Sequence, residues 1–172
     1  MGLTTGVALL SATAANATSL DQLSFDEIVN QSAACVVGKV VSSESVKRNG
    51  QVVTLTTFSV SNTAFGNVSQ TVTVETAGGK SKLGRLQVSE VVAGAPRFFT
   101  NQESLLFLST ANTAGEYKLM GFNQGLFSVN PTGVGVDFVT LPINEGEQMS
   151  VDSALSVIRA ARATSSDLKI TP

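Results

Sequence analysis

The stretch that decides the fold is CVVGKVVSSESVKRNGQVVTLTTFSVSNTA, from Cys35 to Ala64. It contains two long runs rich in valine, threonine and serine, and the β-branched members of these runs favour the pleated, half-buried surface of a β-sheet. Asn49-Gly50 stands between the runs and favours a type I′ turn, because both central residues of that turn need positive φ angles. The sequence therefore predicts a long hairpin with strands over Cys35–Val46 and Val52–Ala64.

The segments around this hairpin carry further strand and helix patterns. Apolar runs and period-two alternation predict strands over Thr71–Glu75, Ser104–Leu108, Glu116–Phe122, Gly125–Val129 and Val134–Leu141. Ser24 with Glu27 three residues later has the pattern of a capping box, which predicts a short helix there. Ser150 precedes apolar residues at helical spacing and predicts a C-terminal helix. The fold class is therefore mainly β with one helix near each end.

Composition limits both the domain count and the partners. The chain has 172 residues, 42% of them hydrophobic and 14% charged, which is enough apolar side chain for the core of one domain. The net charge of −2 provides no basic face able to neutralise several phosphates. The sequence therefore predicts one domain with no nucleic-acid partner.

The N-terminal segment has the composition of an export signal. Residues 1–17 are small and apolar and end in Ala15-Asn16-Ala17, an A-x-A cleavage pattern. The stretch is shorter than the about 20 apolar residues of a membrane span. We expect a signal peptide over 1–17, export to the periplasm or the exterior, a domain over 18–163 and a flexible tail over 164–172. Alternatively, an uncleaved arm could add itself as a strand to a neighbouring molecule.

The residue types used in catalysis are scarce. The chain has no histidine and a single cysteine, Cys35, which lies between apolar neighbours and is expected to be a buried small hydrophobe. We therefore predict a protein that is not an enzyme and that needs no metal or cofactor. A hydrolase that works through carboxylates alone ranks last, because the aspartates and glutamates are scattered along the sequence.

A modest basic loop is the candidate contact surface. Thr76–Ser81 ends in Gly-Lys-Ser, but the first glycine of a phosphate-binding loop would fall at Val74 and no helix start follows. A turn is the better interpretation of this motif. The candidate partner-binding residues are Lys80, Lys82, Arg85, Arg97 and Phe98. The same residues could instead close the fold.

Several stretches carry a resemblance. They are Ser24–Val29, Ala34–Val41, Gly94-Ala95-Pro96-Arg97-Phe98, Leu105–Leu108 and Tyr117–Val129, the last with a Gly-x-x-Gln-Gly-x-Phe pattern. In this order they resemble an uncharacterised family of exported bacterial β-rich proteins over residues 20–162. The family pattern is similar to netrin-like and tissue-inhibitor-of-metalloprotease-like domains. The resemblance implies an OB-like antiparallel β-barrel with a short N-terminal helix and a C-terminal helix.

The resemblance stops short of a known inhibitory mechanism. Metalloprotease inhibitors of this type chelate the zinc of their target with a free N-terminal cysteine, whereas Cys35 is internal and the predicted mature end is Thr18. We therefore expect an exported, non-catalytic binding module for a protein or polymer that the sequence does not identify. An extracellular assembly subunit that donates its N-terminal strand, and a protease-inhibitor-like module that uses loops, remain alternatives.

Overall fold

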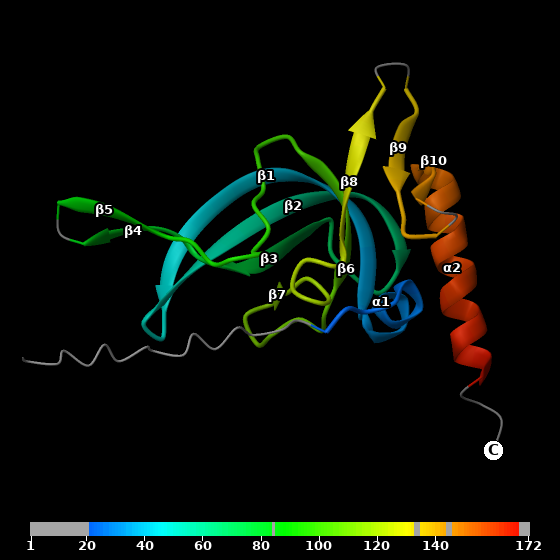
Figure 1. Cartoon of the computed structure of the whole chain (residues 1–172), viewed down its shortest axis with the longest axis horizontal. Helices are drawn as coiled ribbons and strands as arrows, with labels where there is room; N and C mark the ends of the chain where they lie inside the picture. The colour runs from blue at the N-terminus through cyan, green and yellow to red at the C-terminus, as the bar shows by residue number, and fades with distance from the viewer. Residues whose placement is uncertain (1–20, 84, 133–134, 144–145, 169–172) are drawn as a thin grey trace, which may run out of the picture.

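The predicted hairpin is the central element of the structure, a computed structural model that describes residues 21–83, 85–132, 135–143 and 146–168. Strands β1 (Ala34–Arg48) and β2 (Gln51–Phe65) pair antiparallel along their length and bend strongly (Figure 1). The φ angles of Asn49 and Gly50 are 50° and 85°, as a type I′ turn requires. The hairpin prediction is confirmed.

The other elements follow in chain order. They are α1 (Phe25–Gln31), β3 (Thr71–Ala77), β4 (Gly79–Leu83), β5 (Leu86–Glu90), β6 (Glu103–Leu108), β7 (Glu116–Tyr117), β8 (Leu126–Pro131), β9 (Asp137–Thr140), β10 (Gln148–Ser150) and α2 (Val151–Leu168). The protein is thus mainly β, with a short helix near its N-terminal side and a helix at its C-terminal side, as predicted. No helix within the described ranges has both the length and the apolar character to cross a bilayer.

Eight strands form one sheet in the order β10-β9-β8-β6-β1-β2-β3-β7, while β4 and β5 form a separate hairpin. Among the described residues no ladder joins β10 to β7, so the closed barrel that the resemblance implied is not found. The strand predicted over Glu116–Phe122 ends at Tyr117. Gly121 and Phe122 have φ angles of 60° and 69°, which an extended strand cannot accommodate.

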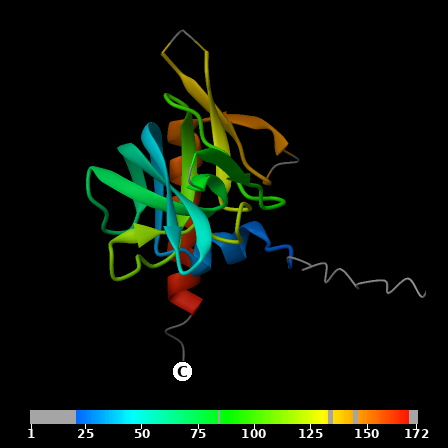
Figure 2. The same cartoon turned by 90° about the vertical axis from the view of Figure 1, so that its left-hand side faces the viewer.

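The two faces of β1 and β6 pack against different partners. On one face Cys35, Val37, Leu105 and Phe107 form a buried core with the two helices, α1 and α2. In Figure 2 the helix α2, orange to red, runs behind the strands of the sheet. Cys35 is fully buried, and burial raises the pKa of its thiol, so the prediction of a buried cysteine is confirmed.

The opposite face of β1 continues onto β2 and β3 and forms the inner face of the bent sheet. We use this name below for the face that carries Val36, Phe58, Val72 and Val74. These side chains are buried together with Leu106 of β6. The segment 91–102, between β5 and β6, runs over this face and contributes Phe98 to its covering.

The helices are fixed by local and long-range contacts. The backbone N–H of Glu27 donates to Ser24 Oγ at 3.3 Å, and the N–H of Ser24 donates to Glu27 Oε2 at 2.8 Å. The second bond lowers the pKa of Glu27, and the two together confirm the capping box. In α2, Arg162 Nη1 donates to the carbonyls of Val29 and Asn30 at 2.9 and 2.8 Å. This arginine therefore satisfies carbonyls at the end of α1.

The C-terminal boundary differs from the prediction. The sequence placed the end of the domain at Ala163 and a flexible tail over 164–172, but α2 continues to Leu168. Helix α2 therefore includes residues 164–168, which the change to a Ser/Thr-rich composition had placed in the tail. Residues 169–172 lie outside the described part of the chain.

The Gly-x-x-Gln-Gly pattern anchors the N-terminal side of the domain. Gln124 Oε1 accepts a hydrogen bond from the N–H of Leu23 at 2.7 Å, and Gln124 Nε2 donates to the carbonyl of Asp21 at 2.9 Å. A Cβ on Gly121 would lie 2.9 Å from Leu23 Cδ1, so glycine lets this turn approach the anchored segment. The pattern is thus architectural. The predicted signal peptide, residues 1–17, lies outside the described residues.

An ion-pair cluster ties β7 to the hairpin. Arg48 Nη2 donates to Glu116 Oε1 at 2.6 Å, and Arg48 Nη1 donates to Glu116 Oε2. Arg48 Nη1 also donates to Glu75 Oε2, at 3.0 Å. Asn112 Nδ2 also donates to Glu116 Oε2 at 3.0 Å. The bonds from Arg48, followed by the bond from Asn112, lower the pKa of Glu116 from 4.5 to about 2.

We expect Glu116→Gln to lower the free energy of unfolding by about 2 kcal/mol at neutral pH, because it removes the charge from a mostly buried acceptor. The depressed pKa of Glu116 means that the stabilisation is complete above pH 4.5 and is lost as the pH falls towards 2. The difference between variant and wild type in urea unfolding should shrink over that interval. The exposed Glu44→Gln is the control, and an equal loss at pH 7 and pH 2.5 for Glu116→Gln would contradict the assignment.

Candidate binding groove

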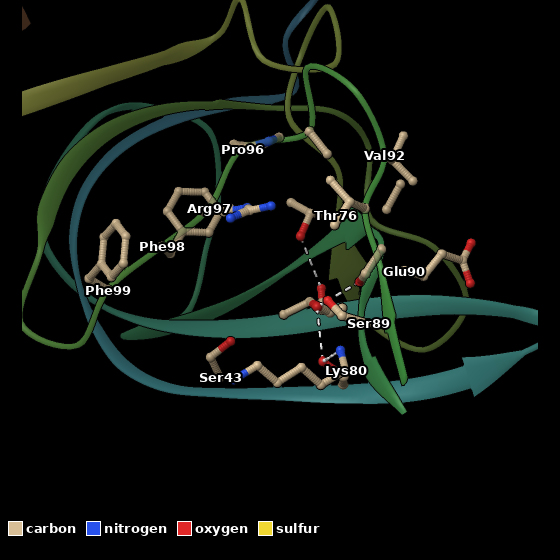
Figure 3. Close-up of a pocket in the computed structure, with 17 residues that line it drawn as sticks. Ser43, Thr76, Lys80, Ser89, Glu90, Val92, Pro96, Arg97, Phe98 and Phe99 are labelled. Carbon is tan, nitrogen blue, oxygen red and sulfur yellow. Dashed lines mark hydrogen bonds between the residues drawn. The ribbon is translucent and has the colours of Figure 1, made fainter. Parts of the chain in front are cut away.

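An open groove of about 520 Å³ lies at one end of the inner face. Its sides are the last residues of β3, the base of the β4–β5 hairpin and the segment from 91 to 99 (Figure 3). Residues of β1 and β2 form its floor. The groove is therefore built by elements that are far apart in the sequence, and the bend of the central hairpin brings them together.

Hydroxyl groups line the floor of the groove. Beyond Phe58 the inner face changes from apolar side chains to serine and threonine: Ser43 Oγ and Thr56 Oγ1 lie 3.2 Å apart, and Ser45 Oγ and Thr54 Oγ1 lie 3.1 Å apart. Thr54 Oγ1 also donates to the carbonyl of Gly78 at 2.7 Å. These cross-strand hydroxyl pairs hold a rigid polar surface where the apolar core ends.

Gly79 lets the chain cross this floor. A Cβ on Gly79 would lie 2.4 Å from both Ser45 Oγ and Thr54 Oγ1, so only glycine permits the approach. The N–H of Lys80 then donates to Ser45 Oγ at 3.1 Å. The Gly-Lys-Ser motif, Gly79-Lys80-Ser81, belongs to strand β4, so it is the start of a β-hairpin and not the turn that the sequence predicted.

The structure separates the predicted contact residues into two groups. Lys80, Arg97 and Phe98 line the groove. Lys82 is paired with Gln87 farther along the β4–β5 hairpin, and Arg85 lies in its turn, so neither is part of the groove. The segment predicted to be a basic loop is instead a hairpin that projects from the body of the protein (Figure 1).

Arg97, Phe98 and Phe99 alternate in direction. Phe98 packs edge-to-face on Phe58, with ring centroids 5.0 Å apart and an interplanar angle of 89°, so it covers the core. Arg97 is exposed, and Phe99 is 69% exposed at the groove. The prediction missed Phe99, although period-two alternation in an extended segment would have placed it on the side of Arg97.

The charged side chains at the groove differ in whether they have a partner. Within the described part of the chain, the side chains of Lys80 and Arg97 have no ion-pair or hydrogen-bond partner. Glu90, a carboxylate at the same groove, accepts a hydrogen bond from the N–H of Val52 at 3.3 Å through Oε2. Two cations are therefore available to a ligand, while the carboxylate is directed to the backbone of β2.

Another groove, of about 320 Å³, has three acidic residues in its lining: Glu103, Asp137 and Asp152. Ser61 Oγ donates to Glu103 Oε1 at 3.1 Å. Among the described residues no group of three histidine, cysteine or acidic side chains is arranged to hold a metal ion.

Comparisons with known proteins add no homologue: no protein-family model, no curated protein and no solved structure matches this chain. The resemblance to exported β-rich proteins therefore stays a prediction.

Proposed function

We propose that the protein is an exported, non-catalytic binding module that holds a stretch of an extended anionic polymer in the groove between the inner face and the segment from 91 to 99. The observation that carries this proposal is the pair of exposed cations, Lys80 and Arg97, that lack partners among the described residues and flank an open groove with a hydroxyl floor. Phe99 and Val91, 69% and 66% exposed, add apolar contact surface at the same groove.

The chemistry of the groove favours binding over catalysis. Ser43, Ser45 and Thr54 form hydrogen bonds with other hydroxyls or with a backbone carbonyl, and the chain contains no histidine that could activate them. The only thiol, that of Cys35, is buried in the core on the other face of the sheet. These features support a surface that positions a ligand without transforming it.

Export is compatible with the way the N-terminal side is anchored. Gln124 holds Asp21 and Leu23, whereas the predicted cleavage point lies between Ala17 and Thr18. Removal of residues 1–17 would therefore leave the anchor intact. The OB-like barrel that the sequence pattern implied would place its ligand along a sheet face and the flanking loops, which is where this groove lies.

The test compares two double variants that remove the same charge. We expect Lys80→Ala with Arg97→Ala to raise the Kd for poly-L-glutamate and for alginate about tenfold, since each exposed cation contributes roughly 0.5–1 kcal/mol. Lys82→Ala with Arg85→Ala, on the projecting hairpin, should change the Kd less than about twofold. Biolayer interferometry at fixed salt measures both, with neutral dextran as the uncharged probe.

Three results would overturn this function. Equal weakening by the two double variants would mean that net charge, not the groove, attracts the polymer. Binding of dextran as tight as that of the anionic probes would mean that the cations do not select the ligand. Failure of the protein to bind either anionic probe would also remove the proposal.

A further inference from the structure

The second half of β1 has a free edge. Strand β6 pairs with β1 only from Ala34 to Lys39, after which Val40 exchanges hydrogen bonds with the segment before β6. From Val41 to Arg48 the only strand paired with β1 among the described residues is β2, on the other side. An exposed strand edge of this kind presents unpaired N–H and C=O groups.

The register shows which backbone groups face that edge. The N–H of Gly78 donates to the carbonyl of Val52 at 2.9 Å, so the backbone groups of Val52 point away from β1. Val52 lies opposite Lys47, and in an antiparallel ladder the groups of such a pair both point outwards. By alternation, the N–H and C=O groups of Ser43, Ser45 and Lys47 face the free edge.

This edge borders the groove. Ser43 and Ser45 belong to the groove floor and to the free edge at once. Lys80 is held beside Ser45 by its backbone hydrogen bond, and Phe99 lies two residues before Asn101, which bonds to Val40 where the edge begins. Figure 3 shows Ser43, Lys80 and Phe99 around one opening.

We propose that the ligand is an extended acidic peptide segment of a partner protein that pairs with the free edge of β1 as an additional strand; this inference rests on the proposed function. Its backbone would complete the ladder at Ser43, Ser45 and Lys47, its acidic side chains would meet Lys80 and Arg97, and an apolar side chain would contact Phe99. A polysaccharide also supplies anionic groups, but it has no alternating amides to satisfy outward N–H and C=O groups repeating every two residues, about 7 Å apart.

The test uses the acetylated and amidated probe peptide EVETEVE in three forms: unmodified, N-methylated at residues 3 and 5, and N-methylated at residues 4 and 6. In an added strand, alternate amides face β1 and the others face solvent. We expect one methylated form to lose at least tenfold in affinity and the other to keep the affinity of the unmodified peptide. Equal affinity of the two methylated forms would overturn strand addition.

A variant of the edge provides the reciprocal test. Ser43→Pro removes the outward N–H, a position where an edge strand tolerates proline, and should weaken the unmodified peptide at least tenfold. Ser43→Ala keeps that N–H and removes only the hydroxyl, so it should weaken the peptide less than Ser43→Pro does. Equal weakening by the two variants would mean that the hydroxyl, and not the outward N–H, makes the contact, and would contradict strand addition at this position. Far-ultraviolet circular dichroism checks that Ser43→Pro is folded. If this variant does not fold, the comparison of the two methylated peptides tests strand addition by itself.

The remaining outcomes separate this inference from the proposed function. If alginate binds in the groove and the acidic peptide does not, the inference fails while the binding module stands. If neither probe binds, both fail. If a peptide of residues 1–17 of this chain binds more tightly than EVETEVE, the free edge serves assembly through a donated strand, and the acidic partner is wrong.

Discussion

Replacing Phe107 by alanine is expected to lower the free energy of unfolding by about 4 kcal/mol. Phe107 is fully buried on β6, in the core beneath the helices. Its ring centroid lies 5.9 Å from that of Phe25, 6.4 Å from that of Phe65 and 5.9 Å from that of Phe127. The substitution removes the ring that α1, β2 and β8 share, so the cavity cannot close by the movement of one neighbour.

Urea unfolding followed by circular dichroism measures this loss, and Phe99→Ala is the matched control. Phe99 is 69% exposed, so the same change there should cost less than about 0.5 kcal/mol. Phe107→Leu keeps most of the apolar volume and should lose less than Phe107→Ala. If Phe99→Ala destabilises as much as Phe107→Ala, the position of the core is wrong.

The elements that could be predicted from the sequence are those fixed by local chemistry. Asn49-Gly50 determines a turn because its conformational requirement is local, and Ser24 with Glu27 determines a helix start because the two residues satisfy each other. Cys35 could be placed in the core because its neighbours on both sides are apolar. In each case the deciding contacts lie within a few residues.

The features that were not predicted from the sequence depend on contacts between segments that are distant along the chain. Local alternation over 116–122 suggested a strand, but Gly121 and Phe122 take positive φ angles in the turn that lets Gln124 hold the segment before α1. The continuation of α2 to Leu168 was not predicted, because the residues after Ala163 are Thr-Ser-Ser-Asp-Leu and carry no apolar pattern at helical spacing. Closure of the sheet into a barrel would likewise need pairing between its two end strands, β10 and β7, which are far apart in the sequence.

Some residues of the candidate site could be predicted from the sequence, and others could not. Lys80, Arg97 and Phe98 could be identified as candidates from charge and motif. Only the crossing of Gly79 over Ser45 shows that Lys80, at the base of the hairpin, lies at the groove, whereas Lys82 and Arg85 lie farther along the same hairpin. The hydroxyl floor was missed because serine and threonine are ordinary strand residues in a sequence. Their importance arises from the bend of β1 and β2, which turns this face toward the segment from 91 to 99.

Gly66 is the turn residue that the structure tolerates least well as alanine. It follows β2 with a φ angle of 95°, and a Cβ there would lie 2.5 Å from Ala34 Cβ and 2.7 Å from the carbonyl oxygen of Ala33. The carbonyl belongs to the backbone at the start of β1, so no change of rotamer relieves the overlap. Gly50 has a similar φ angle of 85°, but a Cβ there would meet nothing within 4 Å.

The pair Gly66→Ala and Gly50→Ala therefore separates steric overlap from the cost of a positive φ angle. We expect Gly50→Ala to lower the free energy of unfolding by about 1 kcal/mol, the cost of placing a Cβ in the left-handed region. Gly66→Ala should lose about 3 kcal/mol, because the overlap with the start of β1 adds about 2 kcal/mol. Urea unfolding of both variants measures the difference. Equal losses would show that the end of β2 can move away from Ala33 and Ala34, and thus that the first residues of β1 are held less firmly than the contacts of Gly66 require.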